Sequence, residues 1–341
     1  MKNVKVIVIG AALTLATWGA LSSGSLDAYV RSLGQSSGTA YRYVEPFDGP
    51  DPASRTTSIK PNEEQLLQSI KDEAEKRKEA PIDAKIDRVW KAIPGYNGIE
   101  VDIEGTWKLA MQRGTENGIP FVYKEIPPSV GLDDLGAEPI YKGNPKKPMA
   151  AFMINVAWGN EYIGTMLDVL EKEGVRATFF FDGSWLSKNV ETAKTIRQKG
   201  HELSNHAYSH KDMSKLGRED TVREIERTQR LLKEQLGVDN TLFAPPSGDF
   251  SSLTVKVAHE MNLRTILWTL DTVDWTKPSS DSIVRKIAAR VEPGALILMH
   301  PTASASGALE GMIKTIRDKG LVLGTVSEVI SPNRVPKVEH P

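Results

Sequence analysis

The 341-residue chain contains no cysteine, and it has only six histidines. The absence of cysteine excludes disulfides, zinc sites built from thiolates and a cysteine nucleophile. An excess of charge of either sign is also missing, because 43 basic and 44 acidic side chains nearly cancel. No global field therefore favours nucleic acid, and we expect no nucleic-acid partner.

A long apolar run occurs at the amino terminus. Lys2 and Lys5 precede an uncharged, mostly apolar stretch over residues 6–21, and small residues follow it. A basic start, an apolar middle and small residues are typical of an export signal. The run is slightly shorter than the ~20 residues of a membrane span, which favours cleavage over anchoring. We predict that residues 1–24 are a signal peptide or anchor, the only membrane contact of an exported protein that is extracellular or membrane-tethered at the cell envelope.

Two segments of different character follow this signal. Residues 25–60 are rich in Ser, Gly, Pro and Asp, which predicts a flexible tether. Residues 61–142 show a capped helix after Asn62 and alternating strands near residues 99–103 and 121–123, which predicts a small α/β domain. Within it, four apolar residues at helical spacing predict a second helix, namely Ile86, Val89, Trp90 and Ile93.

After a linker at residues 143–148, strand-like and helix-like segments alternate through residues 149–331, and residues 332–341 form a tail. Helix-like segments such as 162–173 and 219–236 separate most of the strands. Such alternation indicates a parallel sheet with right-handed crossovers. Seven units in roughly 185 residues favour a barrel one unit short of the eightfold form, with its chemistry at the carboxyl ends of the strands. We expect strands to end near Asn155, Phe181, Ser204, Phe243, Trp268, Met299 and Leu323.

Histidines occur at these predicted strand ends. His206 and His210 follow the third strand, and His300 closes the apolar run over residues 295–299. Imidazole is a ligand that suits zinc, iron, nickel or copper. The sequence therefore predicts a metal-binding loop at His206 and His210, with a third imidazole at the same end of the barrel.

Together, these segments resemble the polysaccharide deacetylases of carbohydrate esterase family 4 (NodB homology). The segment His206–His210 (HAYSH) is similar to the family's paired metal histidines, Asp271–Trp275 (DTVDW) to its fourth motif and Leu296–His300 (LILMH) to its fifth. The domain at residues 61–142 resembles that of YlxY-type, sporulation-associated members.

The resemblance implies an α/β fold with a distorted (β/α)7 barrel preceded by the small α/β domain. It implies removal of acetyl groups from N-acetylated glycans, either peptidoglycan or chitin-like, with a divalent metal (zinc, with cobalt or nickel as alternatives). His300 is then the general acid and Asp274 the carboxylate that tunes it. Substrate-binding positions are Trp275, Ser247 and Leu298.

Two motifs depart from the family pattern. In the first, Asn155 stands where the resemblance implies the aspartate base, and Val156 stands where it implies the third metal ligand. In the third motif, Ala244 replaces the arginine that pairs with the base. The two losses are consistent with each other, because an arginine buried opposite a neutral amide would be an uncompensated charge. Asp182 is our candidate for a replacement third ligand and Glu161 a further one, although Asp182 with Gly183 also suits a simple turn.

Two functional hypotheses follow. The first is a metal-dependent N-deacetylase with impaired activity, which the retained Asp274, Trp275 and His300 favour. The second is a non-catalytic pseudo-deacetylase of the cell envelope or spore that binds a glycan or a partner, which Asn155 and Ala244 favour. Metal-dependent hydrolysis of another ester or amide is a more distant alternative.

Overall fold

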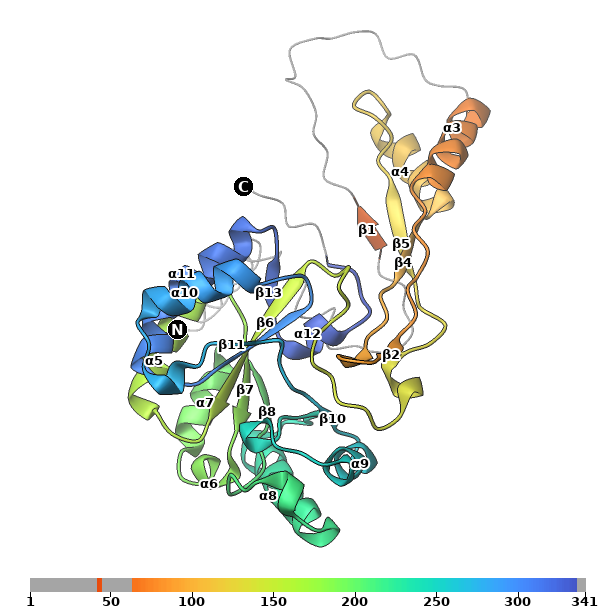
Figure 1. The fold of residues 1–341 in the computed structure, drawn as a ribbon. Coiled ribbons are helices and arrows are strands. Elements are labelled where there is room, and N and C mark those ends of the chain that lie inside the picture. Colours follow the sequence, from red (N-terminus) through yellow and green to blue (C-terminus); the bar gives the residue numbers. More distant parts are fainter. Residues whose placement is uncertain (1–41, 45–62, 336–341) are drawn as a thin grey trace, which may run out of the picture. The chain divides into compact units, whose positions relative to one another are not determined.

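The computed structural model describes residues 42–44 and 63–335 (Figure 1). The predicted signal at residues 1–24, nearly all of the predicted tether and the end of the predicted tail lie outside the described residues. Within the described residues, none of the helices combines the length and the apolar character that a bilayer crossing requires.

Helix α3 (Glu63–Lys76) and helix α4 (Ile103–Arg113) belong to a small α/β domain. Its three-stranded sheet has the order β1-β5-β4, and β4 and β5 pair antiparallel. Ile70 of α3 is fully buried in a cluster that also contains Phe121 and Tyr123. Asp102 ends the predicted strand at residues 99–103 early, because its carboxylate accepts a hydrogen bond from Gly105 N (2.9 Å) and caps α4. The strands are β1 (Arg42–Val44), β4 (Gly98–Val101) and β5 (Val122–Ile126).

The helix predicted from Ile86 to Ile93 is wrong. These residues form an antiparallel hairpin of β2 (Lys85–Asp87) and β3 (Lys91–Ile93). The cause is local, since Asp87 Oδ1 accepts hydrogen bonds from Val89 N and Trp90 N, both at 2.8 Å. Such a side-chain turn competes with helix formation. The apolar residues at helical spacing therefore do not form one helical face.

The barrel sheet has the strand order β10-β9-β8-β7-β6-β12-β11, and β13 also pairs with β6. All of these pairings are parallel. The parallel α/β architecture predicted from the alternation is confirmed. One short strand, β11, was not separately predicted. The bounds are β6 (Met149–Val156), β7 (Thr178–Phe181), β8 (Glu202–Asn205), β9 (Leu242–Phe243), β10 (Arg264–Thr265), β11 (Leu270–Asp271), β12 (Ala295–Met299) and β13 (Val322–Gly324).

The sheet curls into a distorted barrel whose end strands, β10 and β11, are not paired with each other. The segment before the barrel bridges this seam, because Ile140 pairs with Ile266 and Lys142 pairs with Ala295. The linker segment that follows is packed as well. Lys147 is buried and donates hydrogen bonds to the carbonyls of Glu328 and Ser331, and burial lowers its pKa to about 8.

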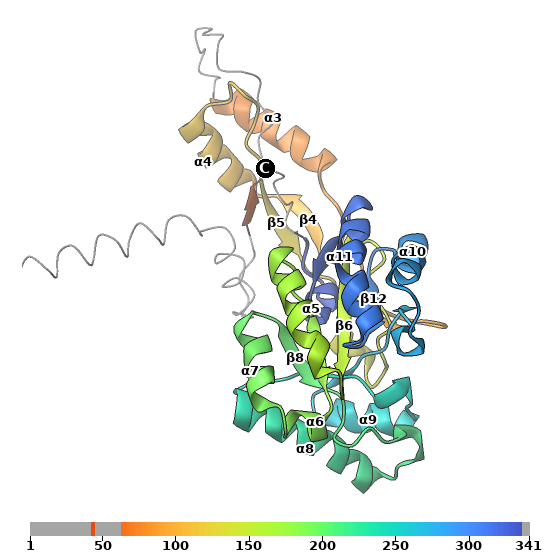
Figure 2. The same ribbon diagram turned by 90° about the vertical axis from the view of Figure 1, so that its left-hand side faces the viewer.

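Helices surround the sheet (Figures 1 and 2). Strand β6 is buried along its whole length, as expected of a central parallel strand. Phe152, Ile154 and Val156 belong to the cluster shared with the surrounding helices, whereas Met153 belongs to a second cluster inside the barrel. Strand alternation therefore directs Asn155 to the barrel interior. The helices are α5 (Asn160–Lys172), α6 (Gly183–Leu186), α7 (Val190–Gln198), α8 (Arg218–Leu236), α9 (Ser252–Glu260), α10 (Ser280–Arg290), α11 (Ala303–Asp318) and α12 (Val326–Ile330).

Candidate active site

The predicted site residues follow the carboxyl ends of neighbouring strands. In register, Asn155 of β6 pairs with Phe180 of β7, and Phe181 pairs with Asn205 of β8. His206 therefore begins the loop directly after β8, while His300 directly follows β12. Because the strands are parallel, these ends meet at the same edge of the sheet.

Asp274 and His300 form a tightly bonded pair. His300 Nδ1 donates to Asp274 Oδ1 at 3.0 Å, and His300 N donates to Asp274 Oδ2 at 2.7 Å. Thr272 Oγ1 also donates to Asp274 Oδ2 at 2.9 Å, and the Asp274 side chain is fully buried. The carboxylate thus fixes the ring tautomer and leaves Nε2 on the opposite side of the ring.

Two exposed tryptophans adjoin this pair. The Trp158 ring stacks on the His300 ring at a centroid distance of 5.8 Å and an interplanar angle of 11°. Trp158 is 46% exposed, and Trp275, which follows Asp274 in the chain, is 60% exposed. Leu298, a predicted substrate contact, is buried in β12. Ser247, another, is exposed in the turn after β9 and has a positive φ of 54°.

His206 and His210 lie together in the loop after β8. Their ring centroids are 5.4 Å apart at an angle of 76°. Burial lowers the pKa of His206 to about 3, and the charges of His210 and His300 act in the same direction. His206 Nδ1 donates to the carbonyl of Ala244 at 2.7 Å, which leaves Nε2 with its lone pair. A neutral imidazole held by a backbone carbonyl is the form found in metal ligands.

Glu224 of α8 holds this histidine loop from behind. Its carboxylate accepts hydrogen bonds from Tyr208 N (3.1 Å), Ser209 N (2.8 Å) and Ser209 Oγ (2.7 Å). Burial acts to raise the pKa of Glu224, but these bonds and the one from Lys211 outweigh it, so the pKa is lowered. Further along α8, the Arg227 guanidinium lies 3.4 Å from the Tyr208 ring centroid. Glu224 was not predicted from the sequence, because it lies 14 residues after His210 along the chain. Its spacing of three and four residues from Arg227 and Thr228 on α8 was the available sequence signal.

Comparisons with known proteins agree with this architecture. Residues 142–266 match a family model described as polysaccharide deacetylase. The chain is 45% identical over 287 residues to the uncharacterised protein YlxY of Bacillus subtilis, a match that covers 84% of this chain and 89% of YlxY. It belongs to the polysaccharide deacetylase family, carbohydrate esterase family 4.

Among solved members of the deacetylase family, the wild-type protein BA3943 of Bacillus anthracis is described as a CE4 family pseudoenzyme. It is 38% identical to this chain with a TM-score of 0.74, over 79% of this chain and 96% of BA3943. A BA3943 mutant is described as having restored enzymatic activity. The peptidoglycan-N-acetylglucosamine deacetylase of Bacillus cereus is 30% identical over 182 residues, which cover 52% of this chain and 66% of that protein. Deacetylases of this family are cell-wall hydrolases that act on C–N bonds of glycans and are generally metal-dependent.

Asn155 is a neutral amide at the position where the resemblance implies an aspartate base. Asn155 is 3% exposed, and its Oδ1 has no hydrogen-bond partner. Ala244, at the position of the family's arginine, is fully buried among apolar side chains inside the barrel. Val156, at the position of the third ligand, packs in the helix-facing cluster. These three side chains are neutral where the resemblance implies a base, an arginine and a metal ligand.

The described residues do not supply the three protein ligands that a catalytic zinc ordinarily takes. Between residues 63 and 335, no three His, Asp or Glu side chains form a group able to hold a metal ion. Asp182 therefore does not join His206 and His210 in such a group. Its Oδ1 accepts hydrogen bonds from Trp185 N (2.9 Å) and Ser184 Oγ (2.5 Å) and caps α6, while its buried Oδ2 has no partner. Glu161 is exposed in the first turn of α5 and does not complete the group either.

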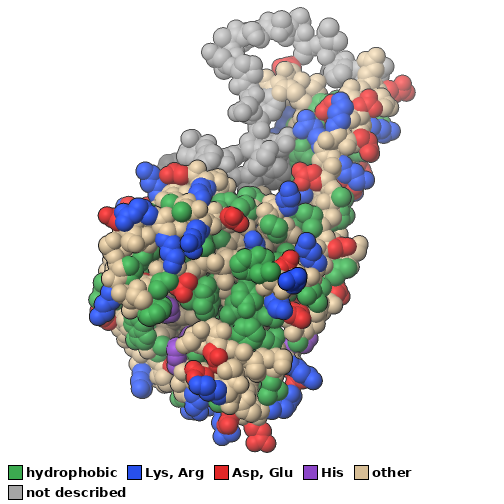
Figure 3. All heavy atoms as spheres, in the orientation of Figure 1, with side chains coloured by type: hydrophobic (Ala, Val, Ile, Leu, Met, Phe, Trp, Pro, Cys, Tyr) green, Lys and Arg blue, Asp and Glu red, His purple; other side chains and the backbone are tan. Residues whose placement is uncertain are grey.

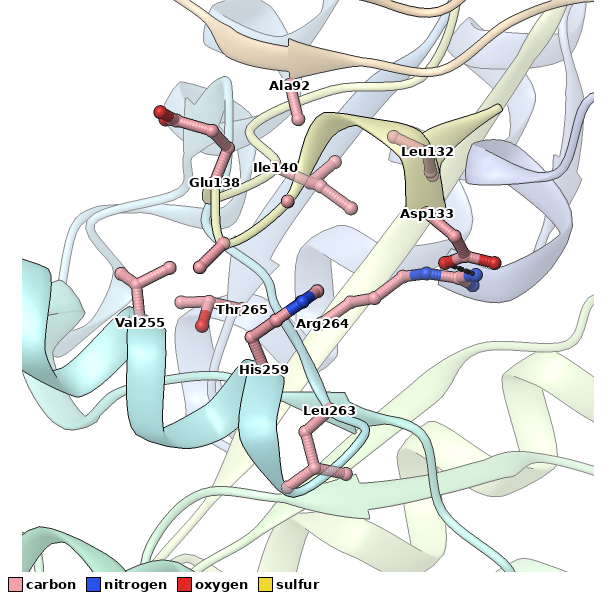
Figure 4. A pocket seen from close by; sticks show the side chains of 12 residues that line it. Ala92, Leu132, Asp133, Glu138, Ile140, Val255, His259, Leu263, Arg264 and Thr265 are labelled. Carbon is pink, nitrogen blue, oxygen red and sulfur yellow. Dashed lines mark hydrogen bonds and ion pairs between the residues drawn. The ribbon is translucent and has the colours of Figure 1, made fainter. Parts of the chain in front are cut away.

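A separate pocket lies away from these residues (Figure 4). Side chains at residues 132–140 line one side of it, and side chains of α9 and β10 line the other, including His259 and Thr265. Arg264 and Asp133, which both line it, form an ion pair at 2.7 Å. None of the predicted site residues lines this pocket.

Proposed function

We propose that this protein binds an N-acetylated glycan of the cell envelope at the carboxyl ends of its barrel strands, and that acetamide hydrolysis there is lost or strongly reduced. The observation that carries the proposal is the neutral, buried Asn155 at the position of the family's base. An amide does not accept a proton at neutral pH, and general-base assistance is typically worth 10²–10⁴-fold in rate.

The donor set leads to the same conclusion. Two imidazoles without a carboxylate are a weaker site than the three-ligand arrangement of catalytic zinc. We therefore assign no step of a reaction to a metal in this protein. The description of the similar protein BA3943 as a pseudoenzyme supports this choice.

Glycan binding rests on groups that the chain retains. Trp158, which stacks on His300, and Trp275, which follows Asp274 in the chain, are both exposed, and aromatic rings provide large apolar contact surfaces. The ring nitrogen of His300 that faces away from Asp274 is available for a hydrogen bond to a bound sugar. The relatives' substrates, peptidoglycan and chitooligosaccharide, are N-acetylated glycans of the kind that we propose as the ligand.

A slow deacetylase is the second candidate, and the intact Asp274–His300 pair favours it. In this reaction water adds to the acetamide carbonyl carbon, and a protonated His300 would transfer its Nε2 proton to the leaving amine nitrogen as the C–N bond breaks, so that acetate and a free amine are released. Asp274 keeps the His300 ring in place. The base half of the reaction has no comparable group. We therefore expect any acetate release by the wild-type chain to be slow.

The test compares glycan binding with acetate release. Calorimetry with N-acetylglucosamine oligomers measures binding to the wild-type chain, and acetate release is followed with and without added Zn²⁺. We expect Asn155→Asp to release acetate at least about 100-fold faster than the wild type. Because a buried, unpaired carboxylate is destabilising, the double variant Asn155→Asp/Ala244→Arg supplies the partner that the family uses.

Asn262→Asp makes the same chemical change at an exposed position and serves as the control. Wild-type acetate release as fast as that of the variants would refute the loss of activity. Absence of oligomer binding by the wild type would refute the glycan ligand. If neither folded variant gained activity with Zn²⁺ present, the placement of the site at Asn155 would be wrong.

A further inference from the structure

The β2–β3 hairpin concentrates the exposed apolar side chains of this protein. Within the described residues, seven large hydrophobic side chains are exposed, and four of them fall between residues 82 and 90. Val89 is 66% exposed, Ile86 56%, Ile82 39% and Trp90 36%. Exposed apolar side chains that cluster in this way mark interaction sites, whereas single ones need no explanation.

The hairpin presents these side chains in an ordered turn. The Asp87 carboxylate accepts the backbone hydrogen bonds of Val89 and Trp90, as described above. The Trp90 ring makes an edge contact with the ring of Tyr141 at a centroid distance of 6.3 Å. The hairpin (orange) extends from the body of the barrel at the right of Figure 2. It is therefore accessible to a broad, flat partner.

Basic residues surround the apolar tip. Lys85, Arg88 and Lys91 are exposed on the hairpin itself, and Lys142 Nζ lies 5.5 Å from the centre of the Trp90 ring. The hairpin also carries Asp87, whose pKa is lowered first by the backbone hydrogen bonds from Trp90 and Val89 and then by the charges of Lys85 and Lys142. Figure 3 shows a basic side chain (blue) standing among hydrophobic ones (green) where Figure 1 places the hairpin.

We propose that the β2–β3 hairpin is a docking element for an anionic lipid bilayer, with Ile86, Val89 and Trp90 entering the headgroup region. Tryptophan is enriched at membrane interfaces, and long basic side chains keep their charged ends in water while their stems cover apolar surface. An anionic surface also attracts each nearby Lys or Arg. A protein partner fits less well, because protein–protein interfaces are depleted of lysine. This contact would be a second one, beside the N-terminal segment that the sequence predicted as the only membrane contact. It is separate from the glycan site and does not depend on it.

A single-cysteine label tests this directly, since the chain has no cysteine of its own. Val89→Cys in the full-length chain is labelled with the polarity-sensitive fluorophore NBD. Vesicles that contain phosphatidylglycerol should raise and blue-shift its emission, whereas vesicles of phosphatidylcholine alone should do so far less. Met111→Cys is the matched control, because Met111 is a 44% exposed apolar residue on α4, away from the hairpin in the sequence. Its label should not respond.

A separate variant tests how much the basic side chains of the hairpin contribute to vesicle binding. Lys85→Gln/Arg88→Gln in the labelled chain should raise the lipid concentration needed for half of the response about 25-fold at low salt, at about fivefold per charge. The predicted N-terminal segment is the same in every variant, so it cannot produce a difference between labels. A silent label at position 89, an equal response at position 111, or an equal response to neutral vesicles would overturn the proposal. A blue-shifted label without vesicles would also overturn it, because the tip would then be covered by the protein itself.

Discussion

Asp274 binds His300 at two points, through the ring Nδ1 at 3.0 Å and through the backbone N at 2.7 Å. The same carboxylate is fully buried and also accepts from Thr272. These contacts hold the His300 ring, the general acid that the resemblance implies, in one orientation. The base half, at Asn155, has an unpartnered amide oxygen instead.

Substituting Asp274→Asn should destabilise the protein by about 1–3 kcal/mol, because one amide group cannot accept all three of these hydrogen bonds. Urea unfolding measures the loss. Asp281→Asn, at an exposed position in the first turn of α10, should change stability by less than about 0.5 kcal/mol. Equal stability of the two variants would show that the Asp274 network contributes little to the fold.

Glu224→Gln should loosen the histidine loop. Glutamine keeps one acceptor oxygen, and its amide group then faces backbone donors of Tyr208 and Ser209, at a cost of about 1–3 kcal/mol. Hydrogen exchange of these two amides should accelerate more than exchange in α8 itself. Glu219→Gln, at an exposed position of the same helix, is the control. Uniformly faster exchange throughout the barrel would argue for a general structural role rather than loop positioning.

Much of the barrel could be predicted because its central strands are continuous apolar runs. Residues 295–299 and 149–156 are buried throughout, and strand ends at Phe181, Phe243 and Met299 coincide with the predicted ends. The helix predicted around Val89 was wrong, because the spacing of apolar residues does not show that the Asp87 side chain forms a competing turn. Local patterns also could not reveal long-range partners.

Contacts between distant strands explain the rest of what sequence reasoning missed. Trp158 follows β6 and His300 follows β12, and they stack only because these strands are neighbours in the sheet. Asp182 illustrates a second difficulty. Its place at a strand end suggested a metal ligand, but Ser184 and Trp185, two and three residues later, engage one of its oxygens. An aspartate at a strand end suits either a metal ligand or a helix cap, and the sequence alone did not decide between the two.

His201 should make stability depend on pH. Burial, and then the nearby charge of Lys199, lower its pKa to about 4 in the folded state, against about 6.5 when unfolded. Between these values the unfolded chain binds a proton that the folded chain does not. The free energy of unfolding therefore falls as the pH drops from 6.5 to 4, by about 1.4 kcal/mol per pH unit for this residue.

The variant His201→Gln isolates that contribution, because other groups titrate alike in both proteins. Urea unfolding at several pH values should give it a slope shallower than that of the wild type by the amount just stated. His259→Gln, at an exposed position of α9, should leave the slope unchanged. Parallel curves for wild type and His201→Gln would mean that His201 is not held neutral by burial.

Substitutions of two exposed tryptophans should distinguish the proposed glycan site from the proposed membrane contact. Trp158 stacks on His300 beside the proposed glycan site, whereas Trp90 lies on the β2–β3 hairpin. Trp158→Ala should weaken binding of N-acetylglucosamine oligomers about tenfold in calorimetry, equivalent to about 1.4 kcal/mol, and should leave vesicle binding intact. Trp90→Ala should do the reverse. Each variant is the control for the other, because both replace an exposed tryptophan by alanine. A shared loss in both variants would point to a general effect on folding, and unchanged oligomer binding in Trp158→Ala would place the sugar away from His300.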